Sequence, residues 1–120
     1  MATLTRQQIT SSGLAATYSS AAGGGDVVDN TDGKTWLHVK NASGSSINVT
    51  ITAQVASAGF DGYGTLTVSN IVVAVAAGAE KFIGPFPRNA YNNSSNQLAI
   101  SYSAVTSVTI AALYLDKQPI

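Results

Sequence analysis

The sequence predicts an all-β protein: a single antiparallel β-sandwich, jelly-roll-like or immunoglobulin-like, preceded by an N-terminal arm. Three observations lead to this fold class. Short segments alternate between apolar and polar residues, as strands with one face in a core do. Clusters of turn-forming residues separate these segments at short intervals. No long window carries the 3.6-residue apolar period of an amphipathic helix.

The alternation is clearest in residues 47–55, where Ile47, Val49 and Ile51 are separated by polar neighbours. The segment 71–76 is rich in alanine, but four of its first five residues are β-branched, which favours a strand over a helix. The whole pattern predicts seven or eight strands. They lie at residues 14–19, 35–41, 47–55, 65–70, 71–76, 81–86, 97–103 and 107–115.

The two ends of the chain differ in how well they fit this pattern. The last two segments are expected to form a C-terminal hairpin, joined near residues 104–106. Residues 1–12 have no clear place in the alternation, so we expect an arm outside the sandwich, and residues 13–120 form the single domain. The expected core contains Leu37, Val39, Val49, Ile51, Val55, Leu66, Val68, Val73, Ile83, Leu98, Ile100, Val108 and Ile110.

Two prolines interrupt the segment before the last pair of strands. Because Pro85 and Pro87 cannot donate a backbone hydrogen bond, this piece belongs at a sheet edge or a corner. We expect Phe86 and Tyr91 to pack that corner.

Composition excludes several classes of function. The chain has 120 residues, only 10% of them charged, and six basic residues balance six acidic ones. A neutral chain has no basic patch for nucleic acid and no electrostatic attraction to a membrane. With no cysteine and one histidine, thiolate sites, disulfides and multi-histidine metal sites are excluded. The first ten residues lack the apolar stretch of a secretory signal, so synthesis in a cytoplasm without Sec export is expected.

The sequence offers no convincing catalytic residue. Alternation places Trp36, His38 and Lys40 on one face of a strand, which predicts a half-exposed His38 on the outer surface. No Gly-x-Ser-x-Gly motif accompanies it. Glu80 is the only glutamate, and no pair of carboxylates stands out for glycoside hydrolysis. We therefore expect that the protein is not an enzyme.

The densest acidic cluster, residues 26–33, raises the question of a calcium site. An EF-hand register would need a ligand at Val28 and a glutamate at Val39, so the motif fails. The Asp32-Gly33 pair instead predicts a turn before the next strand. The glycines at 23–25 lack the lysine and helix start of a phosphate-binding loop. We expect no metal and no cofactor.

The loop at residues 57–64 places two aromatic residues, Phe60 and Tyr63, between glycines. Exposed aromatic side chains at a loop tip are good anchors for a partner surface, because they bury a large area at little entropic cost. Alternatively, Phe60 folds back and closes one end of the sandwich. The sequence leaves both interpretations open.

Four stretches of the chain resemble a known group of proteins. They read WLHVKN at 36–41, INVTI at 47–51, FIGPFP at 82–87 and ISYSAVTSVTIAAL at 100–113. In these stretches the chain resembles small virion proteins of tailed bacteriophages. The resemblance implies a capsid decoration, or cement, protein: a β-sandwich, often trimeric, that sits on the outer surface of the head and bridges capsomers. Its implied partner is the major capsid protein.

For such a role we expect two contact regions. The N-terminal arm is expected to add a strand to the capsid or to a neighbouring protomer by β-augmentation. In the arm, Leu4 and Ile9 are the expected apolar anchors, and Arg6, Gln7 and Gln8 the polar contacts. Phe60 and Tyr63 form the second region.

Two other functions remain open at this stage. A tail, neck or fibre component would share the composition and the sandwich. A carbohydrate-binding module would use Trp36, Phe60 and Tyr63 as platforms on which sugar rings stack.

Overall fold

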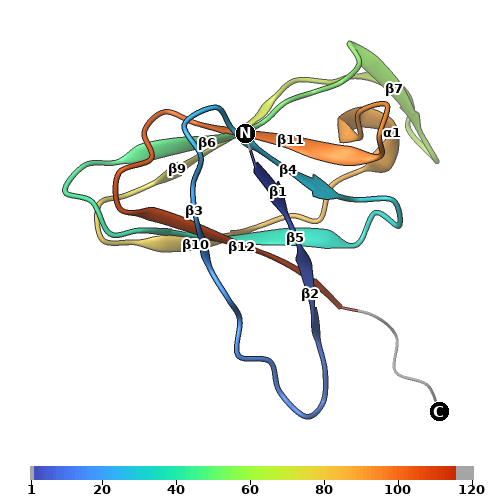
Figure 1. The fold of residues 1–120 in the computed structure, drawn as a ribbon. Helices are drawn as coiled ribbons and strands as arrows, with labels where there is room; N and C mark the ends of the chain where they lie inside the picture. The colour runs from blue at the N-terminus through green and yellow to red at the C-terminus, as the bar shows by residue number, and fades with distance from the viewer. Residues whose placement is uncertain (1, 116–120) are drawn as a thin grey trace.

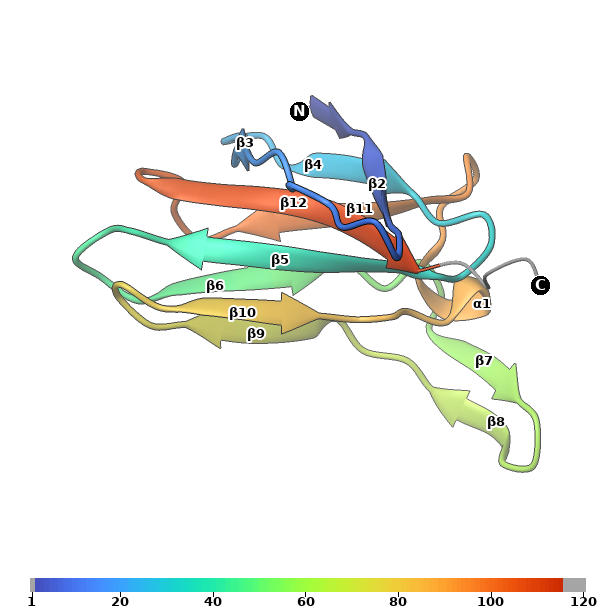
Figure 2. The ribbon, with the colours of Figure 1, turned by 90° about the horizontal axis from the view of Figure 1, so that it is seen from below.

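The computed structural model describes residues 2–115 and confirms an all-β sandwich (Figures 1 and 2). Sheet A has the strand order β1-β4-β11-β6-β9, and sheet B has the order β10-β5-β12-β2, with β3 also paired to β12. Strands β7 and β8 form a separate hairpin. The elements are β1 (Ala2–Leu4), β2 (Arg6–Ile9), β3 (Ser19–Ser20), β4 (Asp26–Asp29), β5 (Thr35–Asn41), β6 (Ile47–Ile51), β7 (Ser57–Phe60), β8 (Gly64–Thr67), β9 (Ile71–Val75), β10 (Glu80–Ile83), α1 (Arg88–Tyr91), β11 (Gln97–Tyr102) and β12 (Val108–Leu115).

The core lies between the two sheets and follows the alternation of the sequence. Strand β5 contributes Leu37 and Val39 from sheet B, and the three inward residues of β6 face them from sheet A. Val55 and Leu66, expected in the core, are exposed. Val55 lies beyond the end of β6, and Leu66 lies in the projecting hairpin, so neither faces the opposite sheet. Of the expected core, Leu37, Val39, Val49, Ile51, Ile83, Leu98, Ile100, Val108 and Ile110 are buried, and Val68 and Val73 are partly buried against it.

The expected C-terminal hairpin is wrong. Strand β11 pairs with β4 and β6 in sheet A, whereas β12 pairs with β5 in sheet B. The turn before β12, closed by a bond from the Val108 amide to the Val105 carbonyl, therefore crosses from one sheet to the other. Two strands that face each other across a core show the same alternation as two strands paired side by side, so the pattern alone did not distinguish them.

The first strands belong to the sandwich, so the expectation of an arm outside it is wrong for residues 2–9. Strand β1 pairs in parallel with β4, and β2 pairs in parallel with β12. The chain thus passes from sheet A to sheet B at Thr5. Each strand is too short to show a period, and the change of sheet at Thr5 interrupts the alternation. These two pairings also make both sheets mixed rather than purely antiparallel.

Several element boundaries differ from the expected ones. Of the strand expected at 14–19, only Ser19 lies in a strand, β3. Strand β4 was not expected, because its two apolar residues, Val27 and Val28, are adjacent and do not alternate with polar ones. Both are buried in the structure. The short helix α1 was also missed. Among residues 2–115, no helix has the length and apolar character needed to cross a membrane.

The proline corner is confirmed. Strand β10 is an edge strand, and the Gly84-Pro85 peptide bond after it is cis. The buried rings of Phe86 and Tyr91 meet edge to face, with centroids 6.5 Å apart. Gly84 has φ 121°, and a Cβ there would approach the Cβ of Trp36 to 2.9 Å, so the corner requires glycine.

Candidate interaction surface

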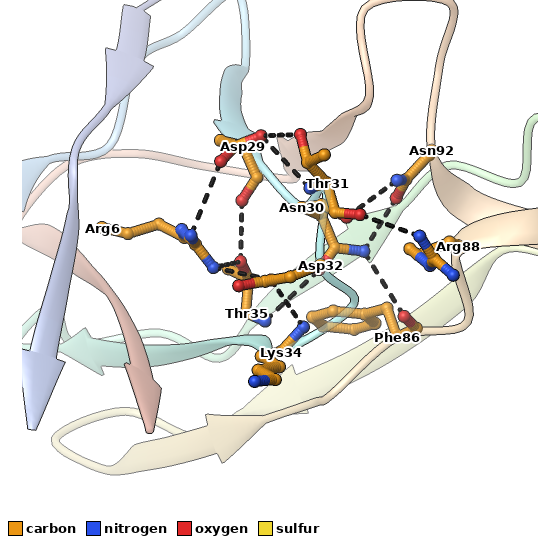
Figure 3. Close-up of polar contacts among 10 residues, drawn as sticks. All are labelled: Arg6, Asp29, Asn30, Thr31, Asp32, Lys34, Thr35, Phe86, Arg88 and Asn92. Atoms are coloured by element: carbon orange, nitrogen blue, oxygen red, sulfur yellow. Dashed lines mark hydrogen bonds and ion pairs between the residues drawn. The ribbon is translucent and has the colours of Figure 1, made fainter. Parts of the chain in front are cut away.

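Arg6 organises the acidic segment between β4 and β5 (Figure 3). Its guanidinium donates a hydrogen bond to Asp32 at 2.8 Å and lies 3.6 Å from a carboxylate oxygen of Asp29. It also donates to the hydroxyl of Thr35 at 3.2 Å. The arginine side chain is only 17% exposed, so it lies within the cluster rather than on the surface. One cation therefore pairs with both carboxylates.

The rest of the segment is held by amide side chains. The buried Asn30 donates to the side-chain oxygen of Asn92 at 2.7 Å, and Asn92 donates back to the Asn30 carbonyl at 2.8 Å. Arg88 donates to the carbonyl of Thr31 at 3.1 Å (Figure 3). These bonds tie the turn to the segment around α1. The expected turn at Asp32-Gly33 is confirmed, with φ 71° at the glycine.

This geometry is that of a structural cluster rather than a cation site. Within residues 2–115, no group of three or more histidine and acidic side chains is arranged to hold a metal ion. Asp32 accepts bonds from Arg6 and from the Lys34 amide. Burial alone would raise the pKa of Asp32, but these hydrogen bonds and the positive charge of Arg6 lower it below its ordinary value.

His38 is buried, which corrects the expectation of a half-exposed residue. It is 5% exposed, because the Phe82 ring stacks on it at 4.0 Å and the Tyr18 ring meets its edge. Its Nε2 lies 3.1 Å from Glu80, and its Nδ1 lies 2.7 Å from the Tyr18 hydroxyl. Because a carboxylate only accepts, Nε2 donates to Glu80, and in the neutral ring Nδ1 accepts from Tyr18.

Both nitrogens of His38 therefore have hydrogen-bond partners inside the protein. The surrounding contacts are also structural. Lys40 lies 3.9 Å above the Tyr18 ring, and Trp36 packs against Phe82 with centroids 5.5 Å apart. These contacts join β5 to β10 and hold the segment before β3 on the outer face of sheet B.

A buried carboxylate lies at the start of β4. Asp26 is 1% exposed and accepts a hydrogen bond from the Tyr102 hydroxyl at 2.7 Å and from the Ala22 amide at 3.3 Å. Its other oxygen, Oδ1, has no hydrogen-bond partner among the described residues. Burial and the neighbouring carboxylate raise the pKa of Tyr102 well above its ordinary value, so its hydroxyl stays a donor.

The hairpin of β7 and β8 projects from the sandwich (Figure 2). At its base the Val68 amide donates to the Ala56 carbonyl at 2.9 Å, and farther along β7 Asn89 donates to the Gly59 carbonyl at 2.6 Å. Phe60 is partly buried and packs against the core, whereas Tyr63 is 78% exposed at the turn. The two aromatics thus play different parts: Phe60 anchors the hairpin and Tyr63 is available to a partner.

The other expected contact residues are mostly used within the fold. Leu4 is buried in the core and Arg6 holds the acidic turn. Gln7 exchanges two bonds with the backbone of Thr17, at 2.7 and 2.8 Å. In β2 only Gln8 is exposed, and Ile9 is half-buried. The exposed residues of the N-terminal segment are Ala2, Thr3, Thr5 and Gln8.

A groove of about 370 Å³ lies beside this segment. Its lining is formed by hydroxyl and amide side chains around Leu4. It is lined by Thr3, Leu4, Thr5, Gln7, Thr17 and Ser19.

The three aromatics considered as a sugar platform are not brought together. Trp36 lies on β5 in sheet B with Phe82 as its ring partner, whereas Phe60 and Tyr63 lie on the hairpin outside both sheets.

Comparison of the chain with family models, curated proteins and solved structures gave no match.

One surface was missed from the sequence: the open side of β9. Residues 71–76 read as an ordinary strand, but β9 is the last strand of sheet A, and Val72 is 58% exposed. The available signal was the absence of any charged residue from 71 to 79.

Proposed function

We propose that the protein is a non-enzymatic capsid decoration protein, which binds the major capsid protein on the outer surface of a tailed-phage head and stabilises capsomer junctions. The observation that carries the proposal is the projecting hairpin, whose strand β7 is bonded to Asn89 and whose turn presents the exposed Tyr63. The resemblance in four stretches of sequence provides the choice of particle.

The hairpin is suited to insertion between capsid subunits. Strand β7 is held by the packing of Phe60 and by the bond from Asn89 to Gly59, so little conformational freedom is lost when a partner binds. Its tip carries a large aromatic side chain and a single charged residue, Asp61. An exposed tyrosine on a preorganised turn is a typical anchor of a protein interface.

The weak charge of the whole chain supports the same function. A surface built from hydroxyl and amide groups makes contacts that depend little on salt, which suits a particle outside the cell. Packaged DNA strains a shell at the joints between capsomers. A decoration protein that contacts several subunits stabilises these joints through several modest interfaces acting together. The protein would be made in the host cytoplasm and act in the virion.

The experiment is immunogold electron microscopy of phage particles with an antibody raised against this chain. Labels spread over the head are expected. Labels confined to a tail, neck or fibre would replace the proposal with the second virion function, and unlabelled particles would reject both. A glycan array with the purified protein tests the carbohydrate-binding alternative, which predicts specific binding that Tyr63→Ala or Trp36→Ala abolishes.

A further inference from the structure

Strand β9 ends sheet A with one side unpaired. Its five residues pair with β6 along their whole length, from Ile71 opposite Ile51 to Val75 opposite Ile47. Within residues 2–115 no other strand pairs with it. Figure 2 shows β9 at the border of the sandwich, and the hairpin projects past this border only near the end where β9 begins.

The ladder identifies which backbone groups of β9 are free. The backbone amide of Asn48 in β6 donates to the Ser103 hydroxyl, next to β11, at 2.8 Å. Its backbone carbonyl accepts from the Ser103 amide at 3.0 Å. The backbone N–H and C=O groups of alternate residues of β6, among them Val49, therefore point toward β9. Their partners in β9, such as Val73, direct their own backbone groups toward β6. Consequently Val72 and Ala74 direct their N–H and C=O groups toward the open side.

This edge lacks the features that usually prevent pairing with another chain. Such features are charged side chains, prolines, bulges and very short strands. The edge strand β10 carries Glu80 and Lys81, β2 carries Arg6, and β1 has three residues. Strand β9 has five residues, all apolar, with no charge and no proline.

We propose that β9 pairs with β9 of a second copy of this chain, antiparallel, around a twofold axis at Val73. In this register Val72 lies opposite the partner's Ala74, and Ala74 opposite the partner's Val72. It satisfies all the free amides and carbonyls of both residues on both strands. If the pairing register shifted by two residues, Val72 or Ala74 would lie opposite a residue outside β9 of the partner.

The side chains of β9 are complementary to themselves in this register, as a twofold interface requires. Ile71 faces the partner's Val75, and Val73 faces the partner's Val73, on the side of the sheet that lines the core. Ile71 and Val73 are only half-buried in the single chain, so pairing completes their burial. The continuous sheet formed from two copies of sheet A has apolar pairs throughout and no like charges opposite each other in β9.

This arrangement gives a closed dimer, which differs from the trimer implied by the sequence resemblance. It does not depend on the proposed function, because it concerns the purified chain alone. The antibody labelling of phage particles and the dimerisation experiments described below can therefore fail independently of each other.

Cysteine cross-linking of the full chain tests the register. The native chain has no cysteine, so Val73→Cys introduces one thiol per copy. In the proposed pair, residue 73 lies opposite itself at a non-hydrogen-bonded position, with Cα atoms about 4.5 Å apart, within disulfide range. We expect mild oxidation to convert Val73→Cys to a covalent dimer. Val72→Cys is the matched control: it is more exposed but lies opposite Ala74, so it should form little dimer.

Analytical ultracentrifugation of the unmodified chain provides the second test, with a concentration-dependent dimer expected. Ala74→Pro removes an N–H that the β6 ladder does not use, so circular dichroism should show the fold retained. The dimer dissociation constant should rise at least about tenfold, because two hydrogen bonds are lost per pair. Val72→Thr keeps the backbone groups and should still dimerise. A monomer at high concentration, a stable trimer, or equal cross-linking at positions 72 and 73 would overturn the proposal.

Discussion

Arg6 donates a hydrogen bond to Asp32 across 2.8 Å, and this contact joins the edge strand β2 to the turn before β5. The same guanidinium lies 4.2 Å from the centroid of the Tyr114 ring on β12, the strand that pairs with β2. One side chain thus fixes the first part of the chain against two regions distant in sequence. Arg6 is one of the residues expected to contact a capsid, and within the chain it stabilises the sandwich.

Replacing Arg6 with methionine should destabilise the protein by about 1–3 kcal/mol, since Asp32 and Asp29 then lose their cation and Thr35 loses a donor. Methionine keeps the apolar stem, so the effect reports the polar contacts. Urea unfolding measures it. Gln8→Met, at an exposed position on the same strand, should change stability by less than about 0.5 kcal/mol. Equal effects at both positions would argue against an anchoring role for Arg6.

Asp32 should make stability depend on pH in the acid range. Its pKa in the folded protein lies below the unfolded value of 3.8, so as pH falls the unfolded chain takes up the proton first. The contribution of Asp32 is therefore complete above about pH 5 and is lost as pH falls below about 4. The stability difference between the native protein and Asp32→Asn should shrink from pH 5 to pH 3 in urea titrations.

An Arg6→Met background provides the control for this pH effect. Without the guanidinium, Asp32 loses a hydrogen bond and a favourable charge, so the same substitution should produce a smaller pH-dependent difference. An undiminished difference would mean that the other donors alone lower the pKa of Asp32.

The fold class and much of the core could be predicted from the sequence because they depend on a local period. Leu37 and Val39 alternate with Trp36, His38 and Lys40, and the period of two places them on opposite faces whatever strands lie alongside. Pairing partners depend on contacts between distant residues. The alternation of β11 and β12 is the same whether they pair or face each other, so the crossing between sheets was not predictable.

The surface residues were harder to predict, because exposure depends on what covers a face. His38 lies on the outer face as expected, yet Phe82 and Tyr18 bury it. For Phe60 and Tyr63, glycine spacing indicated a loop but not which ring would turn inward. Nothing local to β9 shows that it ends a sheet; only the absence of charge gave a hint.

Tyr102→Phe should destabilise the protein by about 1–3 kcal/mol, because it removes a hydrogen bond to the buried carboxylate of Asp26. Asp26 already has one oxygen without a described partner, so the loss leaves the group held only by the Ala22 amide. Thermal unfolding monitored by circular dichroism measures the effect. Tyr63→Phe removes a hydroxyl from an exposed tyrosine and should leave the unfolding temperature almost unchanged.

Tyr63→Ser should separate binding from stability. The side chain is 78% exposed, so its loss should change the free energy of unfolding by less than about 0.5 kcal/mol. If the hairpin tip anchors the protein to the capsid, the apparent affinity for heads that lack this protein should fall at least about tenfold in co-sedimentation, as for a buried aromatic anchor. The hairpin backbone and its anchor Phe60 are unchanged, so the loss would report the tip itself.

Phe82→Ser provides the matched comparison for this binding experiment, since Phe82 is an exposed aromatic, 64% accessible, on sheet B rather than on the hairpin. A general loss of apolar surface would weaken binding in both variants, whereas a specific hairpin contact would weaken only Tyr63→Ser. If Phe82→Ser alone lost binding, the outer face of sheet B would be the capsid-binding surface, and the hairpin would have another role. Because Phe82 also covers His38, its variant must first show a native unfolding temperature at the pH of the assay.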